Sequence, residues 1–150
     1  MKKFILISAT CATLSATPSF AERWVCNFDT SSAKGWITPS LVAQNTGDTY
    51  LLADGIILSS VEAPLKVKAR PNNKSKIGFA WGLTLRSASS KLVKMRYILN
   101  IRKDQGGKAT IRAQPQDYRG NISATGICKE EENDPRLEQA IKQAIQNANK

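Results

Sequence analysis

The chain contains no histidine among its 150 residues. Histidine is the commonest general base near neutral pH and the commonest metal ligand, so serine triads and Cys–His dyads are excluded. The acidic residues are scattered without a catalytic pair, and Gly-rich phosphate-binding motifs are absent. Ser–Lys catalysis would have to use residues 87–91, a stretch typical of a loop. We therefore predict no catalytic residues, no metal site and no cofactor.

Long apolar runs are also missing, since none approaches the roughly 20 residues of a membrane-spanning helix. The most apolar stretch, Phe4 to Leu14, follows two lysines and precedes a region of small residues that ends at Ala21. This pattern predicts a secretory signal peptide over residues 1–21. We expect an exported protein, periplasmic or secreted, without a transmembrane segment.

Cysteine is scarce. Cys11 lies within the signal peptide, and the residues before it lack the Leu that lipidated sites usually carry. Cys26 and Cys128 lie near the two ends of the predicted core, and an exported protein meets an oxidising compartment. We predict that they form one structural disulfide, because no Cys-x-x-Cys spacing suggests a redox role. Closing a loop of about 100 residues is worth roughly 4 to 5 kcal/mol in the chain-entropy model.

Apolar residues alternate with polar ones in several segments, which predicts half-buried strands. The clearest segment is Val93–Ile101, and the pattern recurs in Ile77–Leu85 and in Ala109–Ala113. Weaker candidates are Trp24–Phe28, Trp36–Ala43, Leu65–Ala69 and Ile122–Cys128. The sequence thus predicts an all-β fold, a small antiparallel β-barrel or sandwich of about eight strands. We expect the three tryptophans to lie mostly in its core.

Asp54 and Gly55 separate two apolar runs, Tyr50–Ala53 and Ile56–Ser59. A two-residue Asp-Gly connection is among the strongest local signals for a β-hairpin. We therefore predict a tight hairpin at this point of the chain.

The C-terminal region has a different character. Asp134 and Pro135 are typical of a helix cap and first turn. The apolar residues that follow recur at helical spacing: Leu137, Ala140, Ile141, Ala144, Ile145 and Ala148. We predict a disulfide-closed β domain over 22–129, and an acidic linker and C-terminal α-helix over 130–150. The helix either packs on the barrel or binds a partner or a membrane surface.

The chain that remains after removal of the predicted signal peptide is strongly basic. The 22 basic residues fall to 20 when the signal peptide removes Lys2 and Lys3, which leaves a net charge of +8 against 12 acidic residues. Strand parity places five basic residues on one sheet face, opposite the apolar one: Lys94, Arg96, Arg102, Lys108 and Arg112. Like charges on neighbouring strands are mildly destabilising. This face therefore either serves solubility or binds an anionic partner.

The compartment narrows the partner, because export disfavours nucleic acid. We expect a monomeric, non-enzymatic binding protein whose basic face engages an anionic envelope component, either lipid, lipopolysaccharide or another polymer. An acidic periplasmic or host protein is the other class of partner that the charge allows.

An alternative function comes from a resemblance. The chain contains Trp24-Val25-Cys26, then Ser87-Ala88-Ser89-Ser90, Lys103, Ala109-Thr110-Ile111 and Cys128. This order resembles the periplasmic and membrane-bound inhibitors of C-type lysozyme, although Ser90 stands where that family has Gly. The resemblance implies a disulfide-closed antiparallel barrel that inhibits by loop insertion. Ser89 would enter the lysozyme cleft, and Lys103 would meet a catalytic carboxylate.

Overall fold

The computed structural model describes residues 22–33, 35–117 and 119–131. The predicted signal peptide and the predicted C-terminal helix lie outside these residues. The described chain forms eight strands, one α-helix and one short 3-10 helix. In chain order they are β1 (Arg23–Asp29), β2 (Ser40–Asn45), β3 (Tyr50–Ala53), α1 (Gly55–Val61), β4 (Leu65–Val67), β5 (Lys76–Arg86), β6 (Leu92–Arg102), η1 (Lys103–Gln105), β7 (Lys108–Pro115) and β8 (Ile122–Glu131).

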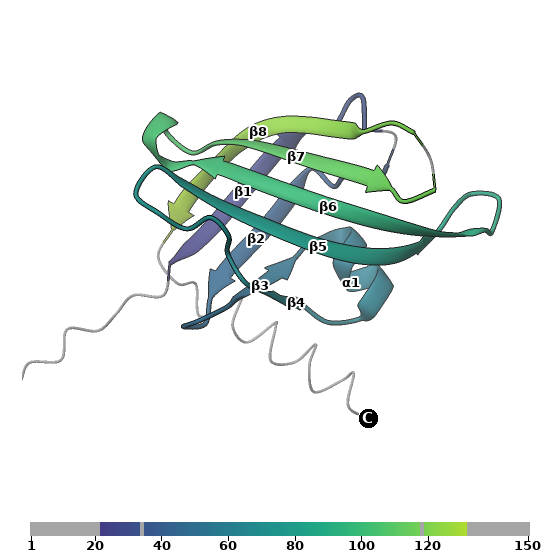
Figure 1. Cartoon of the computed structure of the whole chain (residues 1–150), viewed down its shortest axis with the longest axis horizontal. Helices are drawn as coiled ribbons and strands as arrows, with labels where there is room; N and C mark the ends of the chain where they lie inside the picture. Colours follow the sequence, from purple (N-terminus) through teal and green to yellow (C-terminus); the bar gives the residue numbers. More distant parts are fainter. Residues whose placement is uncertain (1–21, 34, 118, 132–150) are drawn as a thin grey trace, which may run out of the picture.

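All strands belong to one antiparallel sheet in the order β4-β3-β2-β1-β8-β7-β6-β5. The sheet curls into a nearly closed barrel, with α1 beside β5 (Figure 1). This confirms the prediction of an all-β fold of about eight antiparallel strands, and of the two predicted forms, barrel or sandwich, the structure has the barrel-like one.

The segment after β4 approaches β5, the strand at the other end of the sheet order. The Arg70 amide donates to the Gly78 carbonyl at 2.7 Å, and the Gly78 amide donates to the Pro71 carbonyl at 2.8 Å. A Cβ atom at Gly78 would lie 3.0 Å from both the Arg70 carbonyl oxygen and Pro71 Cδ. Glycine therefore permits this close approach, which narrows the gap in the barrel.

The interior is filled by the alternating apolar residues that the sequence predicted. On β6, Met95, Tyr97, Leu99 and Ile101 are each at most 2 % exposed. Trp81 stacks on Tyr97 with ring centroids 5.3 Å apart. Tyr97 also donates to the Trp36 carbonyl at 3.0 Å. Trp24 and Trp81 lie in the core as expected, whereas Trp36 is half-buried at its margin.

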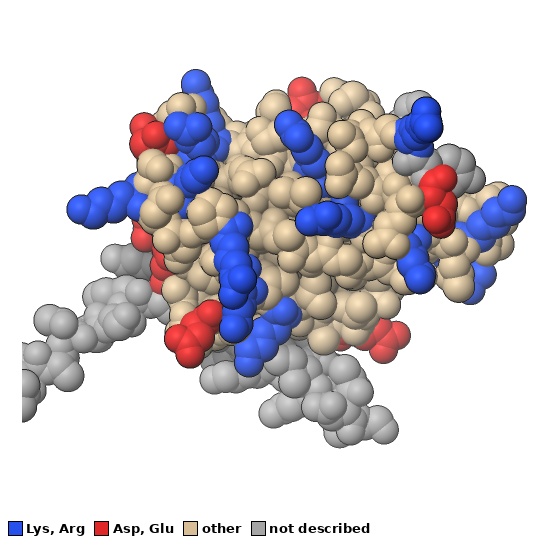
Figure 2. Space-filling view, in the orientation of Figure 1, with Lys and Arg blue, Asp and Glu red and all other residues tan. Residues whose placement is uncertain are grey.

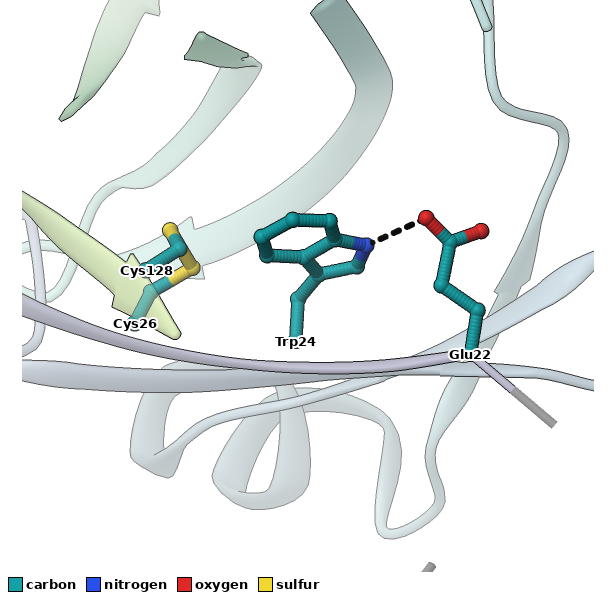
Figure 3. Close-up of a disulfide and its surroundings, with 4 residues drawn as sticks. All are labelled: Glu22, Trp24, Cys26 and Cys128. Carbon is teal, nitrogen blue, oxygen red and sulfur yellow. Dashed lines mark hydrogen bonds between the residues drawn. A yellow bond between two sulfur atoms is a disulfide. The ribbon is translucent and has the colours of Figure 1, made fainter. Parts of the chain in front are cut away.

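The predicted disulfide is confirmed. Cys26 on β1 lies directly opposite Cys128 on β8, and the bond joins the first strand to the last across a sequence separation of 102. Both cysteines are buried on the inner side of the barrel, next to Trp24 (Figure 3). The bond therefore reinforces the pairing that brings the two halves of the sheet together.

The predicted hairpin at Asp54 and Gly55 is wrong, because Gly55–Val61 is the helix α1. The Asp54 side chain accepts a hydrogen bond from the Ile57 amide at 2.7 Å and one from the Thr38 hydroxyl at 3.0 Å. Asp54 is thus an N-cap rather than a turn residue. Burial raises the pKa of its carboxyl, although the hydrogen bonds it accepts act in the opposite direction.

The largest differences from the predicted strand boundaries are at the start of β2 and the end of β8. β2 begins at Ser40 rather than at Trp36. β8 continues through Glu131, so that Glu130 and Glu131 pair with Trp24 and Arg23. These two acidic residues therefore belong to the sheet and not to a linker.

Candidate functional site

The five basic residues predicted to share a face are all exposed. Lys94, Arg96 and Arg102 alternate with buried residues of β6, and Lys108 and Arg112 do the same on β7. Figure 2 shows Lys and Arg side chains spread over the face formed by β5 to β7, whereas Asp and Glu lie near its margins. The structure thus confirms that all five side chains point away from the core, as the alternation predicted.

The register places three cations in one row across three strands. Lys76 on β5 lies opposite Arg102 on β6, and Arg102 lies opposite Lys108 on β7. Directly opposite residues have Cβ atoms about 5 Å apart, so like charges repel each other here. We call these three residues the basic row.

Sequence reasoning missed Lys76 as a member of this row. Its strand was predicted from the apolar residue Ile77 onward, so the lysine just before it was assigned to no face. Lys76 falls on the same alternate positions as Gly78, Ala80 and Gly82, so extending the predicted strand by one residue would have placed it on the outer face. The pairing of Lys76 with Arg102 depends on strand register, which the sequence does not reveal.

In the described part of the chain, one carboxylate forms an ion pair with a residue of the basic row. Asp104 of η1 accepts two hydrogen bonds from Arg102, from Nε and from Nη2, each at 3.0 Å. This bidentate pair lowers the pKa of Asp104 and raises that of Arg102. It fixes the orientation of the guanidinium. Lys76 and Lys108 have no carboxylate within 4.0 Å among the described residues.

An open hollow of about 670 Å³ lies beside the basic row, on the outer surface of β6, β7 and β8. Polar residues form its middle, because Asn100, Thr110 and Thr125 lie opposite one another on the three strands. Arg102, Lys108 and Arg112 also line it. The hollow therefore combines cationic groups with amide and hydroxyl groups that donate and accept hydrogen bonds.

Comparison with protein-family models, with curated proteins and with solved structures finds no match for this chain. The site is therefore interpreted from its own geometry. Among the described residues, no three His, Cys, Asp or Glu side chains gather as a metal site would require. Within the same residues, no helix has the length and apolarity to cross a bilayer.

Lys94 and Arg96 lie on the same face but near the other end of β6. Lys94 is opposite Thr84, and Arg96 lies between Gly82 and Gln114. At about 3.4 Å per residue, Lys94 is roughly 27 Å along the strand from Arg102. Arg112 is opposite Ile98, two residues along the strands from Arg96 and four from the Arg102–Lys108 pair. Of the five predicted residues, only Arg102 and Lys108 therefore lie together near η1.

Ser89 and Lys103 are not brought together. Ser89 lies in the loop before β6, where its hydroxyl is 3.0 Å from that of Ser87, and Lys103 lies in η1 after β6. The eleven residues of β6 separate the two loops, which lie at opposite ends of the barrel (Figure 1). A strand of this length spans about 36 Å. The structure therefore places these two predicted residues in separate loops and does not bring them together.

Lys103 has a partner inside its own chain. Its Nζ donates to Glu22 Oε1 at 2.8 Å and lies 5.7 Å from the centroid of the Trp24 ring. Trp24 Nε1 donates to the same oxygen at 2.9 Å, and the Tyr50 hydroxyl donates to Glu22 Oε2 (Figure 3 shows Trp24 and Glu22). Burial raises the pKa of Glu22, but these hydrogen bonds outweigh it, so the pKa lies below its ordinary value. Lys103 thus joins η1 to the start of β1.

Proposed function

We propose that this protein is an exported, non-enzymatic, monomeric binding protein whose basic sheet face holds an anionic envelope component, either lipid, lipopolysaccharide or another polymer. The observation that carries the proposal is the basic row of Lys76, Arg102 and Lys108, which faces a single carboxylate in the described chain. Three adjacent cations destabilise the free sheet slightly. An anion bound across them removes that repulsion.

The surroundings of the basic row favour a ligand that has hydrogen-bonding groups next to its negative charge. Asp104 holds the guanidinium of Arg102 in place, which lowers the entropy lost when an anion binds beside it. Asn100 and Thr110 offer hydrogen bonds in the adjacent hollow. Phosphate or carboxylate groups attached to a sugar or a lipid headgroup match this combination of charge and hydroxyl chemistry.

The rest of the face suits an extended ligand. Arg112 lines the same hollow, and Arg96 and Lys94 continue the positive surface along β6. A polymer or a lipid surface with repeated charges would contact both parts at once, and each additional contact raises the overall avidity. The long-range attraction should weaken as salt screens it, since the Debye length falls to about 10 Å at 0.1 M.

The test compares two triple variants that lose the same charge. Lys76→Gln, Arg102→Gln and Lys108→Gln remove the basic row, whereas Lys66→Gln, Lys91→Gln and Arg119→Gln remove three exposed cations elsewhere. Binding of mature protein to vesicles with and without anionic lipid, and to lipopolysaccharide, is measured by sedimentation at low and high salt. We expect at least tenfold weaker binding from the first variant and less than threefold from the second.

Equal losses from the two variants would contradict a defined site, because they would mean that only net charge matters. Unchanged binding by the basic-row variant would contradict the proposal altogether. Circular dichroism of both variants serves as the control for folding.

A further inference from the structure

The backbone of β5 has one side that pairs with β6 and one side that faces the gap in the barrel. Gly78 directs both its N–H and its C=O into the gap, where they pair with Pro71 and Arg70. The register with β6 is unbroken along the whole of β5, and in an antiparallel pair this orientation recurs at every second residue. The backbone groups of four further residues therefore also point away from β6: Ala80, Gly82, Thr84 and Arg86.

This second stretch of the edge is open, unlike the stretch at Gly78. Among the described residues, no backbone group pairs with the outward N–H and C=O groups of these four residues. Gly78 is buried, whereas Gly82 is exposed, and exposure of a glycine is exposure of its backbone. A Cβ atom at Gly82 would meet only the Met95 carbonyl oxygen of β6 within 4 Å. We call Ala80–Arg86 the open edge.

The open edge lacks the devices that usually protect an edge strand. Short length, proline, bulges and charged side chains are the common ones. β5 has eleven residues and contains neither a proline nor a bulge, whereas β4 at the other end of the sheet has only three residues. Ala80 and Gly82 present almost no side chain. Another extended chain could therefore pair with the backbone of the open edge.

Charge indicates what kind of chain would pair there. Arg86 belongs to the open edge, Arg96 lies opposite Gly82, and Lys94 lies opposite Thr84. In the described part of the chain, none of these three cations has a carboxylate within 4.0 Å. Two copies that paired along their open edges would bring both sets of cations together, and like charges on neighbouring strands repel. The charges therefore favour an acidic partner over a second copy.

A hollow beside the open edge adds apolar contacts. It has a volume of about 620 Å³ and lies between α1 and the end of β5 (Figure 1). Trp36, Ile56 and Leu85 are among its lining residues. An added strand would continue both faces of the sheet, because its side chains alternate. Half of them would lie beside Leu85 at the hollow, and the other half on the outer face that carries Arg96.

We propose that the open edge binds an extended segment of a partner protein, in which apolar residues alternate with Asp or Glu. The segment adds one strand to the sheet next to β5. Main-chain hydrogen bonds to the open edge supply affinity, and the alternate side chains supply specificity. The apolar side chains enter the hollow, and the carboxylates meet Arg86, Arg96 and Lys94. This site lies apart from the basic row and does not depend on the ligand proposed for it.

Amide exchange of the full mature chain, followed residue by residue by NMR, tests the proposal. The probe is an end-capped eight-residue peptide in which valine alternates with glutamate, and the control peptide has four valines followed by four glutamates. Without peptide, the amides of Gly82 and Thr84 should exchange at least tenfold faster than those of Trp81 and Leu83, which face β6. Saturating alternating peptide should slow Gly82 and Thr84 at least tenfold, and the control peptide should not.

A substitution on the open edge gives a second readout. Gly82→Pro removes an N–H that points away from β6, and proline is tolerated in an edge strand when that side faces solvent. It should weaken binding of the alternating peptide at least tenfold. The triple variant of the basic row (Lys76→Gln, Arg102→Gln and Lys108→Gln) loses more charge but should weaken binding less than threefold. Circular dichroism checks the fold of both, and the exchange measurement on the unsubstituted chain needs neither.

Four outcomes would overturn the proposal. Unchanged exchange at Gly82 and Thr84 with the alternating peptide would mean that no strand is added, and equal slowing by both peptides would mean that charge alone acts. Slow exchange of Gly82 without peptide that becomes fast on tenfold dilution would show that a second copy covers the open edge. Slow exchange that persists on dilution would show that the chain covers its own edge.

Discussion

The two outer surfaces of this barrel differ although the strands beneath them alternate in the same way. On β6 and β7 the outward residues are Lys, Arg, Asn and Thr, whereas on β1 to β3 they include Val, Ala and Leu. Inward residues on both sides meet the same demand, which is to fill a core. The outward residues are free of that demand. Core packing therefore does not explain the difference between the two surfaces.

A carboxylate introduced on each surface should give the largest difference between them. Val42→Asp places a charge on the outer side of β2, where Val42 is half-buried between Val25 and Ala53. Desolvation and lost apolar contact should lower the free energy of unfolding by about 2 to 3 kcal/mol. Thr110→Asp places the same group between Lys108 and Arg112 on β7, so we expect a change below about 1 kcal/mol. Urea denaturation of the two variants measures both values. Similar losses would mean that the two surfaces do not differ in this way.

The Glu22–Lys103 ion pair joins the two halves of the sheet. Its loss should lower the free energy of unfolding by less than Val42→Asp does. Glu22→Gln keeps acceptors for Trp24 and Tyr50 but removes the charge opposite Lys103. We expect a loss of about 1 to 2 kcal/mol at pH 7.

The pH dependence of this loss has a defined sign. The folded pKa of Glu22 lies below the reference value of 4.5, so its ionised form stabilises the protein above that pH. The stabilisation is lost as the pH falls through the folded pKa. The difference in unfolding free energy between the parent protein and Glu22→Gln should therefore shrink below about pH 4.5. A difference that is the same at pH 3 and pH 7 would contradict this role of Glu22.

The smallest expected effect has the opposite sign. Lys108→Gln removes one of the like charges in the basic row, so the unfolding free energy should rise by a few tenths of a kcal/mol. Chemical denaturation at low salt measures this gain, and high salt should reduce it because screening weakens the repulsion. Lys66→Gln on β4 is the matched control, since no cation lies opposite Lys66 on β3. A stability loss in Lys108→Gln would argue against repulsion within the row.

Strands with clear apolar alternation were predicted correctly from the sequence. The prediction failed at Asp54-Gly55, where the same short sequence is compatible with a tight turn and with a helix start. The pattern from Val93 to Ile101 has period two and became β6, with the predicted parity. Asp54-Gly55 suits either a tight turn or the start of a helix, because Asp is favoured in both. Burial of Ile57 and the hydrogen bond from its amide to Asp54 decide for the helix. These contacts depend on packing that the local sequence does not contain.

The candidate site was predicted in part for the same reason. Parity alone identified Arg102 and Lys108 as exposed neighbours on one face, since it needs only the alternation within each strand. The contribution of Lys76 required the register between β5 and β6. The distance between Ser89 and Lys103 required the knowledge that a single long strand connects their loops. Short motifs fix the order of residues along the chain, and only the fold fixes how far apart they lie.

The disulfide between β1 and β8 changes what a break in the backbone would do. The residues from Cys26 to Cys128 form a covalent ring that includes the exposed loop at 87–91. A protease that cuts this loop opens the ring once and leaves both fragments attached through the two cysteines. The nicked strands stay within reach of each other and keep their neighbours in the sheet. Two cuts, or one cut and a reductant, are needed before the barrel can come apart into separate pieces.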